Sequence, residues 1–509
     1  MKGDNLRLVL RCGVAVAALA MSACAPLGPD FKEPEPDWLA TWQPDMLGQA
    51  GADRNAEPMD AWWTRFNDPV LSDLVRKARE ENPGLRLAGL RILESRALQG
   101  IAAGLNYPQV QQLNATGAYV QQRSGGSSQS VETGDISFDL GWELDFWGRF
   151  RRGLESADAA YFASVTNQQD VQVLLAAQVA SLYYGYKTTL QRIEIAENNV
   201  SLQKRSFDIT ERLFNEGQDS ELDLQQAKSQ YLATQATIPG LRLALQQQRN
   251  ALSALLGRAP NDMPELGGVD STLPEMPMTA LQDIPADLLL RRPDVRTAAW
   301  TAAAQSAQIG IAEADLYPAI SLFGSLGWSG NSVGATDNIT SLALGPSLSW
   351  NLFNYGRLKN NVRVQDARLQ QALEAYRSTV LNAARQIEDA ANKIAQTGAS
   401  QEILDQSLTA AERSLAIASR RYQEGYSEFQ RVLDAQASTF AQSDRAIVNR
   451  GDHIAAIIGL YQALGGGWQQ ADINSVIPDT LREQMRERTD WGDLLDAPLA
   501  PPPEPGSMQ

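Results

Sequence analysis

The sequence has very few of the side chains that carry out metal, redox or nucleophilic chemistry. It contains two cysteines, Cys12 and Cys24, and a single histidine, His453, among 509 residues. No glycine-rich loop has the spacing that cradles a phosphate. Beyond Cys24 no thiol remains that could form a disulfide. We therefore expect no metal, no redox centre and no cofactor.

Positive charge is also scarce. The chain has 44 Lys and Arg against 60 Asp and Glu, a formal net charge of −16. A protein that binds nucleic acid needs basic patches to neutralise phosphates. The composition therefore predicts no nucleic-acid partner.

Long apolar runs are missing as well, and no stretch reaches the roughly 18 apolar residues of a membrane-spanning helix. Residues 1–23 have the basic start and short apolar run of a secretory signal peptide. Met21-Ser22-Ala23 before Cys24 resembles a lipoprotein cleavage site. We expect Cys24 to be the lipidated first residue of the mature chain; the alternative is an ordinary cleaved signal with an inert cysteine.

An internal repeat is the most informative feature that is present. The segment Trp142-Glu-Leu-Asp-Phe-Trp-Gly-Arg149 recurs 208 residues later as Trp350-Asn-Leu-Phe-Asn-Tyr-Gly-Arg357. Glu216-Gly217 recurs at the same interval as Glu424-Gly425. A constant offset predicts two copies of one structural unit, much longer than a solenoid repeat. We place the copies at residues 61–260 and 286–468, with a linker at 261–285.

Each copy is predicted to contain a very long helix. No proline occurs between Pro346 and Pro478, and apolar residues recur at alternating spacings of three and four from Leu369 to Ile394. This pattern is typical of coiled-coil packing. We expect one helix over residues 149–216 and one over 357–424, each followed by a helix that returns. Gly217 and Gly425 mark the reversals.

A β-hairpin is predicted before each long helix, at about residues 109–146 and 319–352. From Asp135 to Phe146 the even positions are apolar and the odd positions small or polar, a period of two. Glu143 and Asp145 fall on the polar face of this strand. Loops at residues 123–134 and 329–338 join the strands, and Pro346 is expected to mark a bulge.

These strands favour a membrane position over a soluble sheet. Each is about ten residues long, the length needed to cross a bilayer when tilted. Four strands cannot close a barrel, and lipid does not tolerate an open sheet edge. We therefore expect a homo-oligomer, in which two chains give eight strands and three give twelve with room for water.

Several ordered motifs resemble the TolC-like outer-membrane efflux factors, specifically the OprM/NodT lipoprotein branch. They are Trp62-Trp63-Thr-Arg-Phe66-Asn-Asp68-Pro69, Leu288-Leu-Leu-Arg-Arg292-Pro293-Asp294-Val295 and Leu464-Gly-Gly-Gly-Trp468. The resemblance implies a mainly α fold with β: a homotrimer whose long helices form a coiled-coil barrel in the periplasm and whose twelve strands form a β-barrel in the outer membrane.

The resemblance also implies a function. Such a protein is a passive gated exit duct for drugs or other small molecules, held in the cell outer membrane by its strands and by lipid on Cys24. Its partners would be a periplasmic adaptor protein and an inner-membrane pump of the RND type. The cargo is not encoded in this chain.

In that family the duct closes near the helix reversals, which also contact the adaptor. By resemblance the adaptor-contact tips lie at Gly217 and Gly425. The aligned gate residues are Asp434 in a carboxylate ring, Asp223 and Tyr422 in links between helices, and Arg431 and Gln430 where relatives carry an aspartate and an apolar plug. Arg431 and Asp434 are three residues apart and could pair, which would make the ring less negative.

Two other functions compete with the duct. The first is a periplasmic coiled-coil lipoprotein scaffold without a pore. The second is a hydrolase that uses Glu143 and Asp145 as paired carboxylates, although lining a pore explains them more simply. At the termini, residues 24–60 are expected to run extended along the helices. The acidic, proline-rich tail at 469–509 is expected to be disordered.

Overall fold

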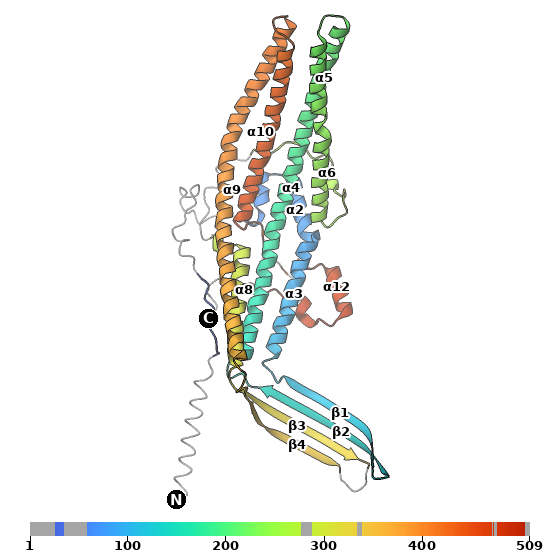
Figure 1. Cartoon of the computed structure of the whole chain (residues 1–509), viewed down its shortest axis with the longest axis vertical. Coiled ribbons are helices and arrows are strands. Elements are labelled where there is room, and N and C mark those ends of the chain that lie inside the picture. The colour runs from blue at the N-terminus through green and yellow to red at the C-terminus, as the bar shows by residue number, and fades with distance from the viewer. Residues whose placement is uncertain are drawn as a thin grey trace.

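The chain forms one elongated subunit, with helices along most of its length and a β-sheet at one end (Figure 1). The structure is a computed structural model and describes residues 26–34, 59–275, 288–332, 338–470, 472 and 476–503. The predicted signal peptide, Cys24 and most of the predicted N-terminal segment lie outside these residues. In the part described, no helix combines the length and the apolarity needed to cross a membrane.

The elements follow the same order in both halves of the chain: short helices, a β-hairpin, a long helix and a returning helix. The helices are η1 Met59–Phe66, α2 Pro69–Glu81, α3 Pro83–Gly104, α4 Arg149–Asn215, α5 Glu221–Gln235, α6 Thr237–Leu255, η2 Pro264–Leu266, α7 Leu288–Arg291, α8 Pro293–Ala314, α9 Arg357–Gln423, α10 Gln430–Ala463, α12 Asp479–Arg488 and η4 Gly492–Leu495. The strands are β1 Val110–Ser124, β2 Ser127–Glu143, β3 Ala319–Asn331 and β4 Ile339–Ser349.

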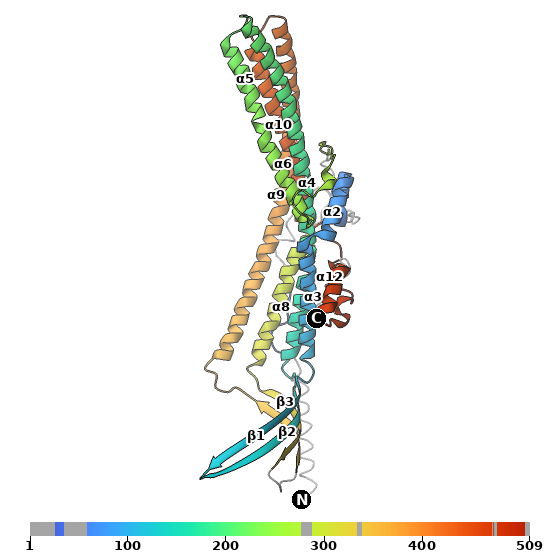
Figure 2. The ribbon, with the colours of Figure 1, turned by 90° about the vertical axis from the view of Figure 1, so that its right-hand side faces the viewer.

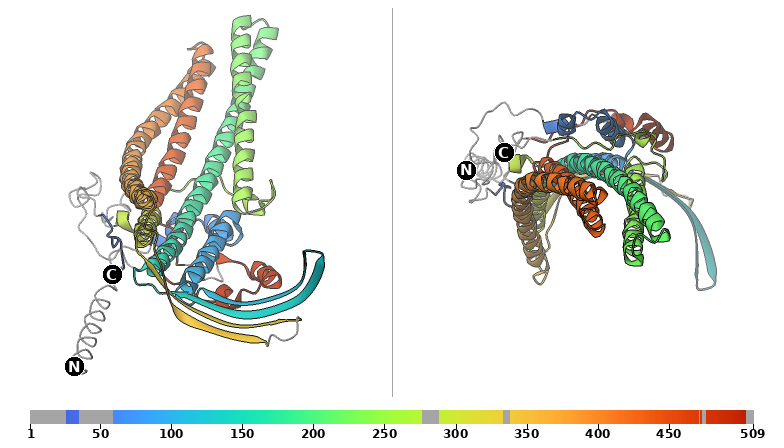
Figure 3. Two further views of the ribbon diagram at one scale, coloured as in Figure 1. Left: turned by 60° about the horizontal axis from the view of Figure 1, so that its bottom comes forward. Right: turned by 90° about the horizontal axis from the view of Figure 1, so that it is seen from above.

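The two long helices confirm the prediction almost to the residue. Both α4 and α9 contain 67 residues and run from the sheet to the opposite end of the subunit (Figure 1). The predicted seam on α9 is buried at Tyr376, Val380, Ala383, Ile387 and Ile394. Seen along the long axis, the helices lie on an arc, with α2 and α12 on its convex side (Figure 3).

Shorter helices are joined end to end beside the long ones. In the second half, α8 and α10 follow one another between α4 and α9 (Figures 1 and 2). Arg292 joins them, because its guanidinium donates to the carbonyl of Ala463 at the end of α10 and pairs with Asp294 in the first turn of α8. Asn82 joins α6 to α3 in the first half: its amide donates to Leu255 O at 2.7 Å, and its carbonyl accepts from a first-turn N–H of α3. Each joint satisfies backbone groups that helix ends leave unpaired.

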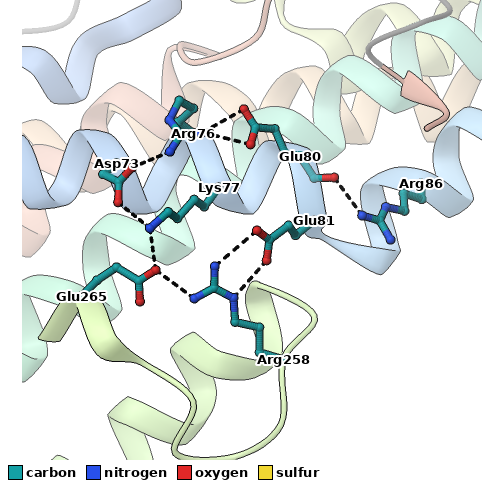
Figure 4. A network of polar contacts seen from close by, with 8 residues as sticks. All are labelled: Asp73, Arg76, Lys77, Glu80, Glu81, Arg86, Arg258 and Glu265. Atoms are coloured by element: carbon teal, nitrogen blue, oxygen red, sulfur yellow. Dashed lines mark hydrogen bonds and ion pairs between the residues drawn. The ribbon is translucent and has the colours of Figure 1, made fainter. Parts of the chain in front are cut away.

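An ion-pair network fixes α2 against the loop that follows α6 (Figure 4). The carboxylate of Glu265 accepts from Lys77 at 2.7 Å and from Arg258 at 2.8 Å, and Arg258 also reaches Glu81 at 2.9 Å. Burial by itself would raise the pKa of Glu265, but the hydrogen bonds from Lys77 and Arg258 hold it below its usual value. The network ties the start of the first repeat to its end.

The largest core cluster lies at the middle of the subunit, where η1 and α2 pack on α4 and α10. Trp62 stacks on Tyr461 with ring centroids 5.1 Å apart, and Phe66 packs against Tyr184 at 5.1 Å. Asp68 caps α2 through Val70 N–H and also accepts from Tyr183. The aromatic motif near the start of the first repeat is therefore a packing element.

The sheet has the order β1-β2-β3-β4 with all neighbours antiparallel, and β2 pairs with β3 in the register Ile136 to Trp328. Three local predictions were wrong. The loop predicted at 123–134 is mostly strand, because a two-residue turn at Gly125 and Gly126 already joins β1 to β2. The strand predicted to reach Phe146 ends at Glu143. Pro346 marks no bulge, since β4 keeps its register with β3 through that residue.

Pro346 is tolerated because β4 is an edge strand of this chain, where a missing N–H need not break the ladder. One face of the sheet exposes large apolar side chains, among them Leu113, Ile136, Phe138, Leu326, Leu342 and Leu344. On the other face Asp139 accepts from Asn114, Ser137 and Ser325 on three strands. In the described part of the chain, the outer edges of β1 and β4 thus pair with no other strand, and the apolar face of the sheet is uncovered.

The predicted disorder of the tail was wrong for residues 476–503. This part contains α12 and η4, and Val476, Ile477, Met485 and Leu495 pack with Leu93 of α3. Beyond η4, Arg96 donates to Ala497 O at 2.8 Å. The prediction was based on the charged composition of the tail and did not take into account its few apolar residues, which pack on α3.

Candidate functional site

The two helical hairpins end in matching reversals. Gly217 and Gly425 have φ values of 74° and 75°, the left-handed region that glycine adopts without strain. In the second hairpin Tyr426 N–H donates to Arg421 O at 2.8 Å, the six-residue closure of a Schellman motif. A Cβ at either glycine would meet no neighbouring atom, so only the backbone conformation requires glycine there. The predicted reversals are therefore confirmed.

A small core holds the two hairpins together near these tips. Its buried members are Ala227, Phe429, Val432 and Leu433, contributed by the segments around α5 and α10. Tyr422, at the end of α9, packs on Phe429 with centroids 5.0 Å apart. Burial raises the pKa of the Tyr422 hydroxyl, and the charges of Asp219 and Asp223 raise it further. The first hairpin thus contributes charges that act on a tyrosine of the second hairpin.

Asp223 also has a local role at the start of α5. Its N–H donates to the hydroxyl of Ser220 at 3.1 Å, and that hydroxyl donates to the Asp223 carboxylate at 2.5 Å. Ser220 therefore caps α5, and the backbone N–H of Ser220 donates to Asp219 at 2.9 Å. The link between Asp223 and Tyr422 that the resemblance implies stays a prediction.

Asp434 and Arg431 are exposed in the first turns of α10, Gln430 is half-buried, and the adjacent Val432 and Leu433 are buried. The expected pairing of Arg431 with Asp434 is not what the structure shows. Gln430 donates to the carboxylate of Asp434 at 2.9 Å instead. Residues four apart lie on the same side of a helix, so the side-chain amide of Gln430 can reach the carboxylate of Asp434. Its partner on its own helix is therefore a neutral amide and not the guanidinium of Arg431.

Two further contacts join the hairpins, and the sequence reading missed both. Gln436 is 3% exposed and donates to the hydroxyl of Ser206 on α4 at 2.9 Å. Gln230 on α5 donates to Leu433 O at 3.0 Å. The sequence pattern that indicates the first contact is a glutamine within an apolar helix face, because Gln436 follows Val432 by about one turn.

The strand carboxylates differ from the prediction. Glu143 is the last residue of β2, and its carboxylate lies 3.5 Å from the guanidinium of Arg149. Asp145 lies beyond the strand and accepts from the N–H groups of Phe150 at 3.1 Å and Arg151 at 2.9 Å. It therefore caps α4, whose first N–H groups have no partner within the helix. The placement of Asp145 on a pore-facing strand was wrong, because the alternation in the sequence continues past the end of the strand.

The comparison with protein families matches this architecture twice. The family described as outer membrane efflux protein matches residues 74–258 and again residues 284–466. The chain belongs to this family. It is an outer-membrane efflux channel of tripartite efflux systems, and because this is a family of non-enzymatic transport proteins, the hydrolase alternative is wrong. The two matches also confirm the two-repeat organisation.

Similar proteins are found over nearly the whole chain. The toluene efflux pump outer membrane protein TtgF of Pseudomonas putida is 30% identical over 471 residues, covering 89% of this chain and 95% of that protein. The cation efflux system protein CusC of Escherichia coli is 30% identical over 472 residues, covering 89% and 98%. Nodulation protein T of Rhizobium leguminosarum is 28% identical over 463 residues, covering 89% and 96%.

Solved structures agree on the fold. A structure of the outer-membrane channel OprN matches with a TM-score of 0.79 and 31% identity, covering 87% of this chain and 99% of that one. A CusC structure matches with a TM-score of 0.73 and 27% identity, covering 87% and 100%. The predicted TolC-like fold and the resemblance to the OprM/NodT branch are therefore confirmed.

Proposed function

We propose that this channel is a passive, gated exit duct that works as a homotrimer. The observation that carries the proposal is the four-stranded sheet, in which the outer edges of β1 and β4 are open and one apolar face is uncovered. An open edge is not tolerated in lipid, so β1 and β4 must pair with neighbouring chains. Three chains give a twelve-stranded barrel, wide enough for water and cargo. The arc of helices in Figure 3 is a shape that three copies can close into a tube.

The gate of this duct lies at the tips. Asp434 from three subunits forms a carboxylate ring, and Gln430 and Arg431 occupy neighbouring positions in the same turns of α10. Tyr422 and Asp223 link the two hairpins, and the effect of the Asp223 charge on the pKa of the Tyr422 hydroxyl supports this role. Gln430 rather than Arg431 bonds to Asp434, so Arg431 does not pair with the ring carboxylate within the chain. Opening is a shift of the α9 and α10 hairpin away from α4 and α5.

The duct has partners on both sides of the periplasm. The tips at Gly217 and Gly425 contact a periplasmic adaptor, which connects the duct to an inner-membrane pump of the RND type. Lipid on Cys24 adds an anchor in the outer membrane. The relatives named above are described as serving toluene and cation efflux, and this chain moves small molecules that its pump selects.

Single-channel recording tests the duct and its gate. The full-length protein is purified in detergent and inserted into planar bilayers as wild type, Asp434→Ala and Asp452→Ala. Asp452 is a matched control, since it is an exposed aspartate on the same helix, several turns from the tip. We expect stepwise conductance in all three, with a higher open probability only in Asp434→Ala.

Two results would contradict the proposal. Silence in all three proteins, together with extraction that needs no detergent, would favour the scaffold over the duct. Identical recordings from wild type and Asp434→Ala would remove Asp434 from the gate.

A further inference from the structure

The anchor segment, residues 26–34, is bound in a cleft of its own chain beside the junction of sheet and helices. Leu27 N–H donates to Trp147 O at 3.0 Å. Arg152 donates to Leu27 O at 2.9 Å and to Gly28 O at 3.0 Å, and pairs with Asp30 at 2.8 Å. The Arg152 side chain is only 3% exposed. A buried guanidinium with three acceptors from one short segment is a specific contact, because a charge without partners is costly to bury.

Three glycines make room for this segment. A Cβ on Gly310 of α8 would lie 2.4 Å from Leu27 O, and a Cβ on Gly148 would lie 2.4 Å from Pro26 Cβ. Gly28 has a φ of 86°, and a Cβ there would lie 2.5 Å from the Cα of Gly310. These distances are well below van der Waals contact, so the cleft and the segment fit each other only with glycine at all three positions.

The segment bridges the two repeats. Arg152 belongs to α4 in the first repeat. Ser306 of α8 donates to Pro29 O at 3.4 Å, and the hydroxyl of Tyr376 on α9 donates to the Glu33 carboxylate at 3.2 Å. One short peptide therefore contacts three helices of the layer.

The second repeat has no equivalent cleft. The positions 208 residues after Asp145, Trp147 and Arg152 hold Phe353, Tyr355 and Asn360. Phe353 is 90% exposed and Tyr355 is 100% exposed. Docking therefore secures only one of the two strand–helix junctions within the chain.

We propose that Gly148, Arg152 and Gly310 form a receptor site for the anchor segment, and that docking there, not acylation, positions the N-terminus. The consequence for the membrane rests on the proposed lipid attachment at Cys24. This residue precedes Pro26 by two positions, so the acylated residue lies within roughly 7 Å of Pro26, which contacts Gly148 at the start of α4. The acyl chains are thereby placed at one point on the circumference of the duct.

The test separates docking from lipid. The full-length Cys24→Ser protein cannot be acylated there, and it serves as the background for Arg152→Ala, Gly28→Val and Arg149→Ala. Docking is read from hydrogen exchange at the Leu27 amide and from the rate of tryptic cleavage after Lys32. Arg149 is the matched control, because it lies one turn before Arg152 and pairs with Glu143, not with the segment.

We expect slow exchange and slow cleavage in Cys24→Ser alone and with Arg149→Ala. Arg152→Ala and Gly28→Val should speed cleavage by on the order of tenfold or more, since each removes charge-assisted bonds or the fit. Gly28→Val alters only the segment, so it decides the matter if Arg152→Ala does not fold.

Rapid exchange in Cys24→Ser alone would overturn the proposal, and so would unchanged cleavage in both Arg152→Ala and Gly28→Val. Conductance recorded on the same preparations keeps the two proposals apart. A chain that docks its segment but never conducts would count against the duct and leave the receptor site standing.

Discussion

Asp170 provides a sharp test, because its environment opposes its charge. It lies on α4 in a polar cleft shared with α8 and α9, whose other lining residues are Asn167, Asp294, Thr297, Thr379, Asn382, Arg385 and Gln386. Burial and, to a smaller extent, the charge of Asp294 raise the pKa of Asp170 from 3.8 to about 6, and the charge of Arg292 opposes part of this rise. The folded state is therefore less stable when Asp170 is ionised than when it is protonated.

The magnitude follows from the pKa difference. A rise of about two pKa units corresponds to about 3 kcal/mol. The pKa of Asp170 is higher in the folded state than in the unfolded state. The stability associated with the protonated carboxyl group is therefore fully present below pH 3.8 and is lost as the pH rises through about 6. Asp170→Asn cannot ionise, so it should raise the free energy of unfolding by about 2–3 kcal/mol near pH 7.5. Near pH 4 the gain should fall below about 1 kcal/mol.

The assay is thermal unfolding in detergent, followed by circular dichroism at both pH values. Asp208→Asn is the matched control: it lies on the same helix, and its exposed pair with Lys204 contributes at most about 1 kcal/mol at either pH. A gain that is equal at both pH values, or a loss of stability near pH 7.5, would refute the argument from burial.

Three further predictions concern contacts that the sequence did not reveal. Asp145→Ala should lower the free energy of unfolding by about 1 kcal/mol through loss of the α4 cap and leave conductance unchanged; altered conductance at full stability would return Asp145 to the pore. Ser206→Ala should cost about 1–3 kcal/mol, because it leaves the buried amide of Gln436 unpaired, whereas Gln436→Leu removes that amide altogether and should cost less. Equal losses in calorimetry would show that this hydrogen bond does not matter. Arg96→Ala should loosen residues 497–498 and speed tryptic cleavage after Arg488, and an unchanged rate would mean that the remaining contacts, such as that of Ala500 with Tyr161, hold the tail.

The sequence alone was sufficient for the long-range plan of the protein. The interval between Gly217 and Gly425, shared by the other repeated motifs, predicted two repeats. The absence of proline, together with a regular apolar seam, predicted the bounds of α9 to within one residue. These features depend on interactions between residues three to five apart, so the order of side chains carries them directly. The family motifs added the fold and the expectation of a channel.

Other features required the tertiary structure. Asp145 continues the alternation of β2 and yet caps α4, and Arg152 pairs with Asp30, a residue far away in the sequence. The tail was predicted to be disordered from its charge, although a few of its apolar residues pack on α3. A side chain's partner depends on which backbone groups the fold leaves unsatisfied nearby, and that is known only once distant segments have come together.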